Sequence, residues 1–316
     1  MWWKDGRFGG VLANRGDLYT LKSMTEINTE LHVLAERNSQ AIPHSQNHLG
    51  SPASLNDPPG SSDGAALPKQ GAVERDGGMT RPEAPALSPA ERQAMAAKES
   101  TIDVMILYTP KVRSKYIDVE TDVAVRSIDD ANTSFVNSGI GNVKLRLVHT
   151  QGIDYDETDG EYFNHLYRMV DGVGAFARIR ALRNEKRADV VVLIVDDASG
   201  CGLTTRVSAD AEEAFAVVHH ACAALTYSVP HEIGHIIGAG HDVSLDQGSP
   251  FSYGHGYVNG TKWRDIMSYN TSCGGCPRVA LWSNPTITIK GQPAGTAQAD
   301  NARVILEQAE RVAKFR

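Results

Sequence analysis

Four residues of the types that bind and use a metal ion fall in one short stretch of the chain. His231 and His235 are four positions apart, and Glu232 directly follows the first of them. On an α-helix, residues four positions apart lie on one face about one turn apart, so both imidazoles can bind the same ion. Gly238 allows the backbone to turn sharply after such a helix, which would return His241 to that ion. The spacing therefore predicts a metal site with three histidine ligands.

The ligand set favours one catalytic Zn²⁺ ion. Imidazole nitrogens bind Zn²⁺ at about 2.0–2.1 Å, and three protein ligands leave a fourth position open, as in catalytic rather than structural zinc sites. Glu232 is placed to act as the general base for a zinc-bound water. The alternative, a surface helix that carries histidines by chance, is disfavoured by Gly238 and the third histidine. The motif predicts metal-assisted hydrolysis of a peptide bond.

A second motif lies downstream of the histidines. Met267 is followed two residues later by Tyr269. Taken alone, a methionine in an apolar run is more often core filling. After the zinc motif, it resembles the Met-turn of the metzincin metallopeptidases. The resemblance implies that Met267 forms a hydrophobic floor beneath the imidazoles. It also implies that Tyr269 reaches the zinc or the oxyanion, with a buried core tyrosine as the alternative.

The resemblance extends well beyond the motif. Asp242, directly after the third histidine, is similar to the reprolysin-like branch of the metzincins. Residues 101–316 resemble the bacterial peptidyl-Asp metalloendopeptidase family, with matching segments at 102–109, 188–195, 215–222, 253–257 and 282–285. The family implies a preference for aspartate on the C-terminal side of the cleaved bond. The spacing of the motif does not itself imply that preference.

A pocket that selects aspartate needs a cation. Arg278 follows the Met-turn, in the region where metzincin chains form the wall of that pocket, and Arg264 and Lys262 lie just before it. Arginine suits a carboxylate because it binds through two parallel N–H groups. We expect Arg278 as the first candidate and Arg264 as the second, whereas Lys262 is more readily explained as a surface charge.

Other polar residues near the motif are expected to be structural. Asp242 should hydrogen-bond the chain after His241. His219 and His220 lie on an apolar strand, where successive side chains alternate in direction, so at most one of them can face the cleft. His255, in a glycine-rich loop, could be a fourth ligand, but three histidines already complete a catalytic set.

The four cysteines allow three pairings. We expect disulfides Cys201–Cys222 and Cys273–Cys276, which would fit an oxidising compartment. The alternative is four buried thiols. The second pair could also be a redox pair or half of a zinc site, but the chain holds no other Cys-x-x-Cys.

Composition limits the class of protein. The 316 residues are 41% hydrophobic with a net charge of −7, which supports a real core and argues against nucleic acid as the main partner. No apolar run approaches the roughly 18 residues of a membrane span. The N-terminal residues lack the features of a signal peptide, so for a secreted or periplasmic protein we expect a truncated or wrongly assigned start. Polypeptide substrates are the expected partners, and a monomer the expected state.

Composition also divides the chain into three parts. Residues 1–37 contain short β-type runs and resemble the end of a prodomain. Residues 38–98 are rich in Ser, Asn, Gly, Pro and Ala, which is typical of a flexible linker, with a weak helix at 89–98 and an activation cut near 90–100. Residues 99–316 are expected to form the zinc metallopeptidase catalytic domain of a zymogen.

Hydrophobic periodicity in the catalytic part predicts alternating strands and helices. We expect strands at 104–108, 143–148, 189–195 and 215–220, and helices at 119–136, 162–182, 227–237 and 300–314. This order predicts an α/β (α+β metzincin-like) fold with a mostly parallel twisted sheet, an active-site helix and a C-terminal helical subdomain, preceded by a small β-rich prodomain remnant.

The function that these features favour is a zinc-dependent metalloendopeptidase with an aspartate preference. Two rivals remain: a broad-specificity reprolysin-like protease, and a zinc-bearing binding or toxin component with incidental proteolysis. Glu232 argues against the second rival, because a pure binding protein has no need of a general base.

Overall fold

The computed structural model describes residues 2–4, 7–14, 17–23, 32–37, 85, 87–159, 162–245 and 249–316. The chain divides into two compact units, Met1–His44 and Ser45–Arg316. The first unit holds an antiparallel sheet in the order β1 (Trp2–Lys4), β2 (Arg7–Asn14), β3 (Asp17–Ser23) and β4 (His32–Arg37). These are the β-type runs expected at 1–37. Most of the expected linker, residues 38–84, lies outside the described residues.

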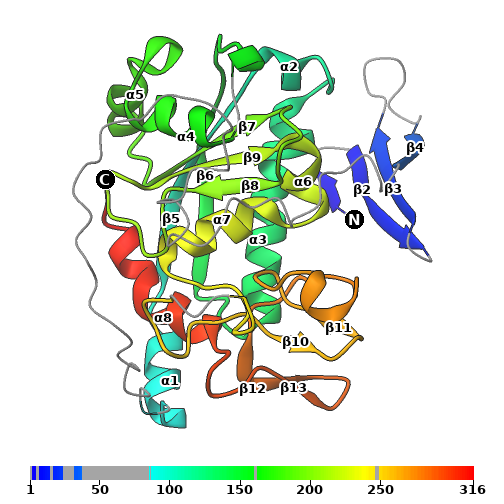
Figure 1. The fold of residues 1–316 in the computed structure, drawn as a ribbon, viewed down its shortest axis with the longest axis vertical. Helices are drawn as coiled ribbons and strands as arrows, with labels where there is room; N and C mark the ends of the chain where they lie inside the picture. Colours follow the sequence, from blue (N-terminus) through cyan, green and yellow to red (C-terminus); the bar gives the residue numbers. More distant parts are fainter. Residues whose placement is uncertain are drawn as a thin grey trace, which may run out of the picture. The chain divides into compact units, whose positions relative to one another are not determined.

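The second unit is built on a five-stranded sheet in the order β6-β5-β7-β9-β8 (Figure 1). All neighbouring strands are parallel except edge strand β8, which runs antiparallel to β9. The mostly parallel sheet is confirmed, and its strands are β5 (Ser100–Tyr108), β6 (Val143–Gly152), β7 (Val190–Val195), β8 (Gly202–Thr204) and β9 (Phe215–His219).

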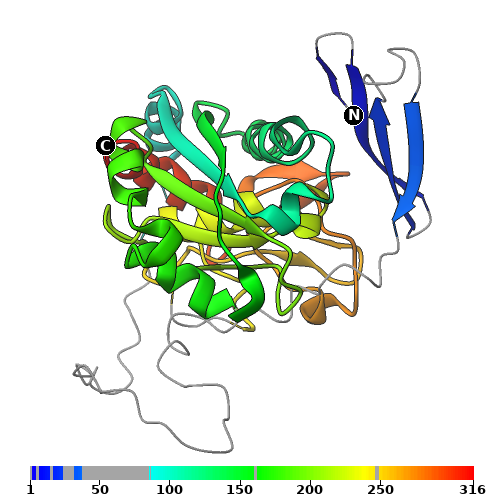
Figure 2. The ribbon, with the colours of Figure 1, turned by 90° about the horizontal axis from the view of Figure 1, so that it is seen from above.

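Helices cover both faces of this sheet, and side-chain alternation along the strands supplies two hydrophobic clusters. Val190, Val192 and Ile194 of β7 belong to one cluster, and Val191 and Leu193 belong to the other. The first cluster includes residues of α3 (Arg126–Asn137), α7 (Ser228–Ile237) and α8 (Asn301–Val312), and the second includes residues of α4 (Tyr162–Val170) and α5 (Ile179–Glu185). Figure 2 shows α4 and α5 on the side of the sheet opposite α3. Because both faces are covered, β7 is apolar throughout.

Two expected helices have internal changes. The helix expected at 119–136 begins as a π-helical segment, η3 (Glu120–Val125), and continues as α3. The helical region expected at 162–182 is divided between α4 and α5, because Gly172 and Gly174 adopt φ angles of 67° and 60° between them. The remaining short elements are α2 (Pro110–Arg113), η4 (Glu157–Asp159), η5 (Gly174–Phe176), α6 (His220–Leu225) and η6 (Thr271–Cys273).

The part that follows α7 differs from the expected C-terminal helical subdomain. It contains two small antiparallel sheets, β10 (Val258–Asn259) with β11 (Trp263–Arg264) and β12 (Asn284–Ile289) with β13 (Gln292–Ala294). Its one long helix among the described residues is α8, which begins after Asp300 as expected, with the Asp300 side chain accepting a hydrogen bond from the Arg303 amide at 3.0 Å. Glycines recur between residues 254 and 295 and interrupt the helical periodicity there, so this stretch forms loops and short strands rather than α-helices.

The helix expected within 89–98 is α1 (Pro89–Ala96), and it packs on α8. Ser88 and Glu91 form a capping box at its start. Arg92 forms an ion pair with Asp300, the N-cap of α8, and Lys98 pairs with Glu310. The last part of the compositional linker is thus ordered against α8.

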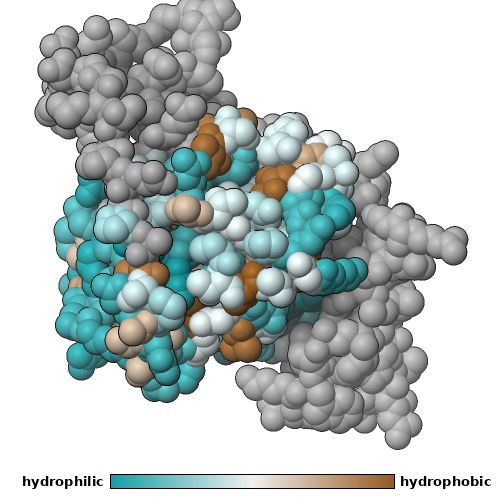
Figure 3. Space-filling model, turned by 90° about the horizontal axis from the view of Figure 1, so that it is seen from below, coloured by the Kyte–Doolittle hydropathy of each residue, from teal (hydrophilic) through white to brown (hydrophobic). Residues whose placement is uncertain are grey.

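Among the described residues, few large apolar side chains are exposed: Ile117, Val136, Val173, Val243 and Leu245. On the face shown in Figure 3, hydrophobic residues form separate small patches among hydrophilic ones. In the described part of the chain, no helix has the length and hydrophobicity to cross a membrane.

Candidate metal centre and active site

The first two histidines of the motif project from α7, which is buried along its whole length. Tyr227 precedes the helix in the left-handed region with a φ of 59°. Gly234, between the two histidines, allows a close approach: a Cβ there would lie 2.5 Å from Cη2 of Trp282 and 3.3 Å from Sδ of Met267. The glycine therefore lets the helix pack directly on the expected Met-turn.

The third histidine is returned to α7 by a glycine turn. Gly238 has a φ of 135°, and its amide donates to the carbonyl of Gly234 at 2.9 Å, which ends the helix as the sequence predicts. Two residues later, the side chain of Asn301 accepts from the amide of Gly240 at 3.2 Å and donates to its carbonyl at 2.9 Å. Asn301 thus ties the turn before His241 to the start of α8.

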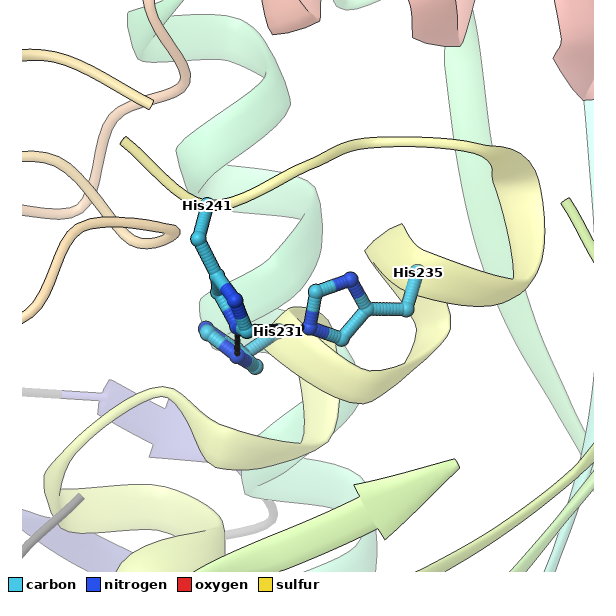
Figure 4. Close-up of side chains that lie close together, drawn as sticks. All are labelled: His231, His235 and His241. Atoms are coloured by element: carbon cyan, nitrogen blue, oxygen red, sulfur yellow. Dashed lines mark hydrogen bonds between the residues drawn. The ribbon is translucent and has the colours of Figure 1, made fainter. Parts of the chain in front are cut away.

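The three imidazoles face one another (Figure 4). The Nε2 atom of His241 lies 2.9 Å from Nε2 of His235 and 3.3 Å from Nε2 of His231. Ligands of a tetrahedral Zn²⁺ at 2.0–2.1 Å are separated by about 3.3 Å, so the spacing fits such an ion. Nδ1 of His231 donates to the Ile266 carbonyl at 2.9 Å, and Nδ1 of His235 donates to the Ala239 carbonyl at 2.8 Å. These bonds place the proton on Nδ1 and leave the Nε2 lone pairs for a metal.

A second histidine cluster departs from the sequence prediction. The alternation of a strand was expected to separate His219 from His220, but β9 ends at His219, and His220 begins α6. Because the backbone changes from strand to helix between them, both imidazoles lie close to Asp196. The expectation that they face opposite sides is therefore wrong.

In this second cluster the ring proton lies on Nε2, whereas His231 and His235 of the first cluster carry it on Nδ1. Nδ1 of His219 accepts from the Ala221 amide at 3.1 Å. Burial, followed by the neighbouring His220, lowers the pKa of His219 to about 4, so the ring is neutral and its proton lies on Nε2. His220 turns Nε2 toward a carboxylate oxygen of Asp196 at 2.8 Å, and Lys115 pairs with the other oxygen at 3.1 Å. The nitrogens of the second cluster thus face hydrogen-bond and ion-pair partners, whereas in the first cluster the Nε2 atoms face one another.

Glu232 lies in the interior beside the edge strand β8. A Cβ at Gly202 would lie 2.5 Å from its Oε1 atom, so the glycine allows the carboxylate to approach the strand. Burial raises the pKa of Glu232 well above its usual value, and the positive charge of Arg278 opposes that rise. A buried carboxylate with a raised pKa, next to His231 in the sequence, is suited to taking and returning a proton.

The turn at Met267 is organised by Asp265, a residue that the sequence reasoning did not select. One carboxylate oxygen accepts from the amides of Met267 and Ser268 at 3.1 and 2.9 Å and from the Ser268 hydroxyl at 2.7 Å. The other oxygen accepts from the Ser283 amide at 3.1 Å. Asp265 thus shapes the turn whose Ile266 carbonyl orients His231. The only feature of the sequence that could have indicated this role is the position of Asp265 directly before the apolar pair Ile266 and Met267.

Tyr269 and Asp242 connect this turn to the third histidine. The hydroxyl of Tyr269 lies 3.2 Å from Nε2 of His241, so it reaches the point where the imidazoles meet. Asp242 accepts from the Tyr269 amide at 3.2 Å and from the Ser244 hydroxyl, so it hydrogen-bonds the chain after His241 as expected. His255 donates through Nδ1 to the His241 carbonyl at 3.1 Å and lies outside the described histidine cluster.

Two of the three candidate cations, Arg278 and Arg264, share the Ser268 carbonyl as a hydrogen-bond acceptor. Arg278 donates to the Thr226 carbonyl at 2.7 Å and the Ser268 carbonyl at 3.4 Å, and it acts electrostatically on Glu232. Arg264 also donates to the Ser268 carbonyl, at 3.0 Å. Lys262 is exposed and donates to Gln292, on the surface between β11 and β13.

Both expected disulfides are formed. Cys201–Cys222 joins the start of β8 to α6, and Cys273–Cys276 closes a short loop after the Met-turn. The described residues contain no free cysteine.

Known proteins and one family model match the second unit of this chain. A family model described as metallo-peptidase family M12 matches residues 98–283. A protein of Xanthomonas campestris pv. campestris named peptidyl-Asp metalloendopeptidase is 35% identical over 311 residues, which cover 97% of this chain and 67% of that protein. A protein of the same name from Stenotrophomonas maltophilia strain R551-3 is 37% identical over 231 residues, which cover 71% of this chain and 55% of that protein. The chain thus spans between half and two thirds of the length of these relatives.

A solved structure supports the fold alone. One chain in a chaperone-substrate complex matches with a TM-score of 0.56 at 19% identity, covering 69% of this chain and 35% of that chain.

Proposed function

This chain belongs to the metallo-peptidase family M12, and on that premise we propose that it is a zinc-dependent metalloendopeptidase that prefers aspartate on the C-terminal side of the cleaved bond. The observation that carries the proposal is the convergence of three Nε2 atoms at 2.9 and 3.3 Å, with two of the rings oriented through Nδ1 by backbone carbonyls. Three imidazoles arranged in this way suit one catalytic zinc ion.

The residues of the site have different proposed roles. His231, His235 and His241 hold the zinc, which when bound supplies a Lewis acid for water and for the scissile carbonyl. Glu232 takes a proton from the attacking water and returns it to the leaving amine, for which its burial and raised pKa suit it. Tyr269, with its hydroxyl 3.2 Å from Nε2 of His241, is placed to donate a hydrogen bond to the oxyanion that develops there.

Arg278 is the proposed receptor for the aspartate side chain. Its Nε is buried and has no hydrogen-bond partner among the described residues, and the bond from its Nη2 is long at 3.4 Å. Burial, together with the adjacent Arg264, lowers the pKa of Arg278 to about 9, so an anionic partner would stabilise its charge. A carboxylate can accept from Nε and Nη2 side by side.

The position of Arg278 favours the residue after the cleaved bond. Its charge acts on Glu232, the group that protonates the leaving amine. That amine belongs to the residue on the C-terminal side of the bond, so a cation near Glu232 is well placed to bind the side chain of that residue. The relatives' name, peptidyl-Asp metalloendopeptidase, supports the same selectivity.

The rest of the proposal concerns location and organisation. Two disulfides support a secreted or periplasmic location, since such bonds persist in oxidising compartments. We infer a monomeric precursor in which residues 1–37 are part of a prodomain, residues 38–98 a linker and residues 99–316 the catalytic domain. Because α1 is capped and paired with α8, an activating cut before α1 fits better than one at 90–100.

One experiment separates the proposal from its rivals. A peptide library is digested by the zinc-loaded chain, by the chain after chelation and by Glu232→Gln, and the new N-termini are identified. We expect zinc-dependent products that begin with aspartate and are missing with Glu232→Gln. Zinc-dependent products without an acidic N-terminus would support a broad-specificity protease instead. Zinc binding without turnover would support a binding or toxin component.

A further inference from the structure

Arg278 and Arg264, the first and second candidates for the pocket, form one structural unit although they are fourteen positions apart in the sequence. Their backbones pair in parallel: the Arg264 amide donates to the Pro277 carbonyl at 3.0 Å, and the Val279 amide donates to the Arg264 carbonyl at 2.9 Å. Both guanidinium groups donate to the same acceptor, the carbonyl of Ser268. Two cations therefore share one wall beside the active site.

The two side chains differ in how their donors are used. Arg264 donates Nε to the Cys276 carbonyl at 3.2 Å and Nη1 to the Ser268 carbonyl at 3.0 Å, so backbone acceptors hold it from two directions. Arg278 keeps a buried Nε without an acceptor among the described residues. Backbone carbonyls thus hold both guanidinium groups, and of the two arginines only Arg278 keeps an Nε that can donate to a ligand.

The acceptor that holds Nε of Arg264 belongs to the short disulfide loop. Cys276 is linked to Cys273 across two glycines with φ angles of 66° and 90°. The Cys276 amide donates to Sγ of Cys273 at 3.2 Å, and the amide of Gly275 donates to the Asn270 carbonyl at 2.8 Å. Glycines in this conformation would leave the loop flexible without a covalent constraint, so the disulfide determines where the Cys276 carbonyl lies.

We propose that the Cys273–Cys276 loop and Arg264 are positioning groups for Arg278, and that together they set the selectivity for an acidic residue after the cleaved bond without taking part in the chemical step. This inference rests on the proposed function, because it names the device behind the aspartate preference. If the loop opens, Arg264 loses an acceptor and is free to move against its like-charged neighbour. Arg278 then no longer presents Nε and Nη2 in one fixed direction, and a rigid receptor for a carboxylate becomes a mobile one.

The test compares two peptides that differ only in aspartate or asparagine after the scissile bond. Zinc-loaded full-length chain is assayed as wild type, Arg278→Gln, Arg264→Lys and the double variant Cys273→Ser/Cys276→Ser. Arg264→Lys keeps the charge but removes the fork that reaches two carbonyls. The matched control is Cys201→Ser/Cys222→Ser, which opens the other disulfide and leaves the arginine wall intact.

For wild type we expect a large ratio of kcat/KM between the aspartyl and asparaginyl peptides. This ratio should fall about tenfold in both positioning variants, mainly through a higher KM for the aspartyl peptide, because a hydrogen bond to a charged group is worth roughly a factor of ten or more. The control should keep the wild-type ratio, even if its overall rate falls. Calorimetry with product-side peptides that begin with aspartate or asparagine should show the same loss of discrimination without turnover.

The outcomes distinguish aspartate selectivity itself from the positioning role of Arg264 and the Cys273–Cys276 loop. A wild type without preference for aspartate over asparagine overturns the aspartate selectivity in the proposed function, and the present inference with it. A clear wild-type preference that Arg278→Gln removes, but that both positioning variants retain, overturns only the present inference. Zinc content and turnover of the asparaginyl peptide report whether each variant is folded. If the double cysteine variant fails those checks, Arg264→Lys decides.

Discussion

Gly234 offers the sharpest test of how α7 packs on the Met-turn. In Gly234→Ala, the new Cβ would lie 2.5 Å from Cη2 and 2.6 Å from Cζ3 of Trp282, and 3.3 Å from Sδ of Met267. Carbon atoms normally approach to about 3.5–4.0 Å, so helix and indole must separate by roughly 1 Å. Trp282 is fully buried, and its Nε1 donates to the hydroxyl of Ser134 at 2.8 Å, so it has little room to move.

Two effects of opposite sign decide the outcome. Replacing a glycine inside a helix by alanine favours the folded state by about 1 kcal/mol. Overpacking a tight core costs about 1–3 kcal/mol, and a 2.5 Å approach to a buried ring belongs at the upper end of that range. We therefore expect Gly234→Ala to lower the free energy of unfolding by about 1–2 kcal/mol, as measured by urea denaturation. Because His231 and His235 flank the substitution, a shift of about 1 Å should also lower kcat/KM by roughly a hundredfold.

A double-mutant cycle identifies the cause. Trp282→Phe removes the ring atoms that the new Cβ would meet, at its own cost in packing and in the bond to Ser134. If the clash is the cause, Gly234→Ala should be about 1 kcal/mol or more less harmful in the Trp282→Phe background. Additive effects, or a stabilisation by Gly234→Ala alone, would refute the reasoning.

Other predictions test separate parts of the account. His235→Ala should lose stoichiometric zinc and all activity, and full zinc occupancy measured by elemental analysis would argue against the ligand assignment. Asp265→Ala leaves three donors at the Met-turn and the Ser283 amide without their acceptor, so we expect the free energy of unfolding in urea to fall by about 3 kcal/mol or more, and a wild-type midpoint would be inconsistent with that role. Opening Cys201–Cys222 should cost about 3 kcal/mol, because it closes a loop with a sequence separation of 21, and an unchanged stability would contradict this. Limited proteolysis should spare α1 (Pro89–Ala96), and an early cut inside that helix would show that it is not held on α8.

Local patterns predicted the parts of the molecule that depend on local geometry. The spacing of His231, His235 and His241 implied a helix and a glycine turn, and the structure brings the three rings together through both. The apolar residues predicted a strand at 189–195, and β7 (Val190–Val195) is that strand, buried along its length because helices cover both faces of the sheet. Periodicity alone could not predict where helices break, and Gly172 and Gly174 interrupt the region that was expected to be one helix.

The features that the sequence did not predict depend on contacts between distant parts of the chain, or on where an element ends. The role of Asp265 includes the amide of Ser283, which lies beyond the disulfide loop in the sequence, and no spacing rule connects the two. The division of labour between Arg264 and Arg278 follows from which backbone carbonyls each side chain reaches, and that depends on the folded turn. His219 and His220 were assigned to opposite faces because the strand was assumed to continue for one residue more than it does.

The central claim is that Glu232 activates water beside a zinc ion held by three histidines. Zinc content and peptide turnover, measured on the same sample of Glu232→Gln, test it most directly. The account predicts one zinc per chain with turnover reduced by about 10²–10⁴, the usual contribution of a general acid–base group. Full zinc content with turnover equal to that of wild type would contradict it.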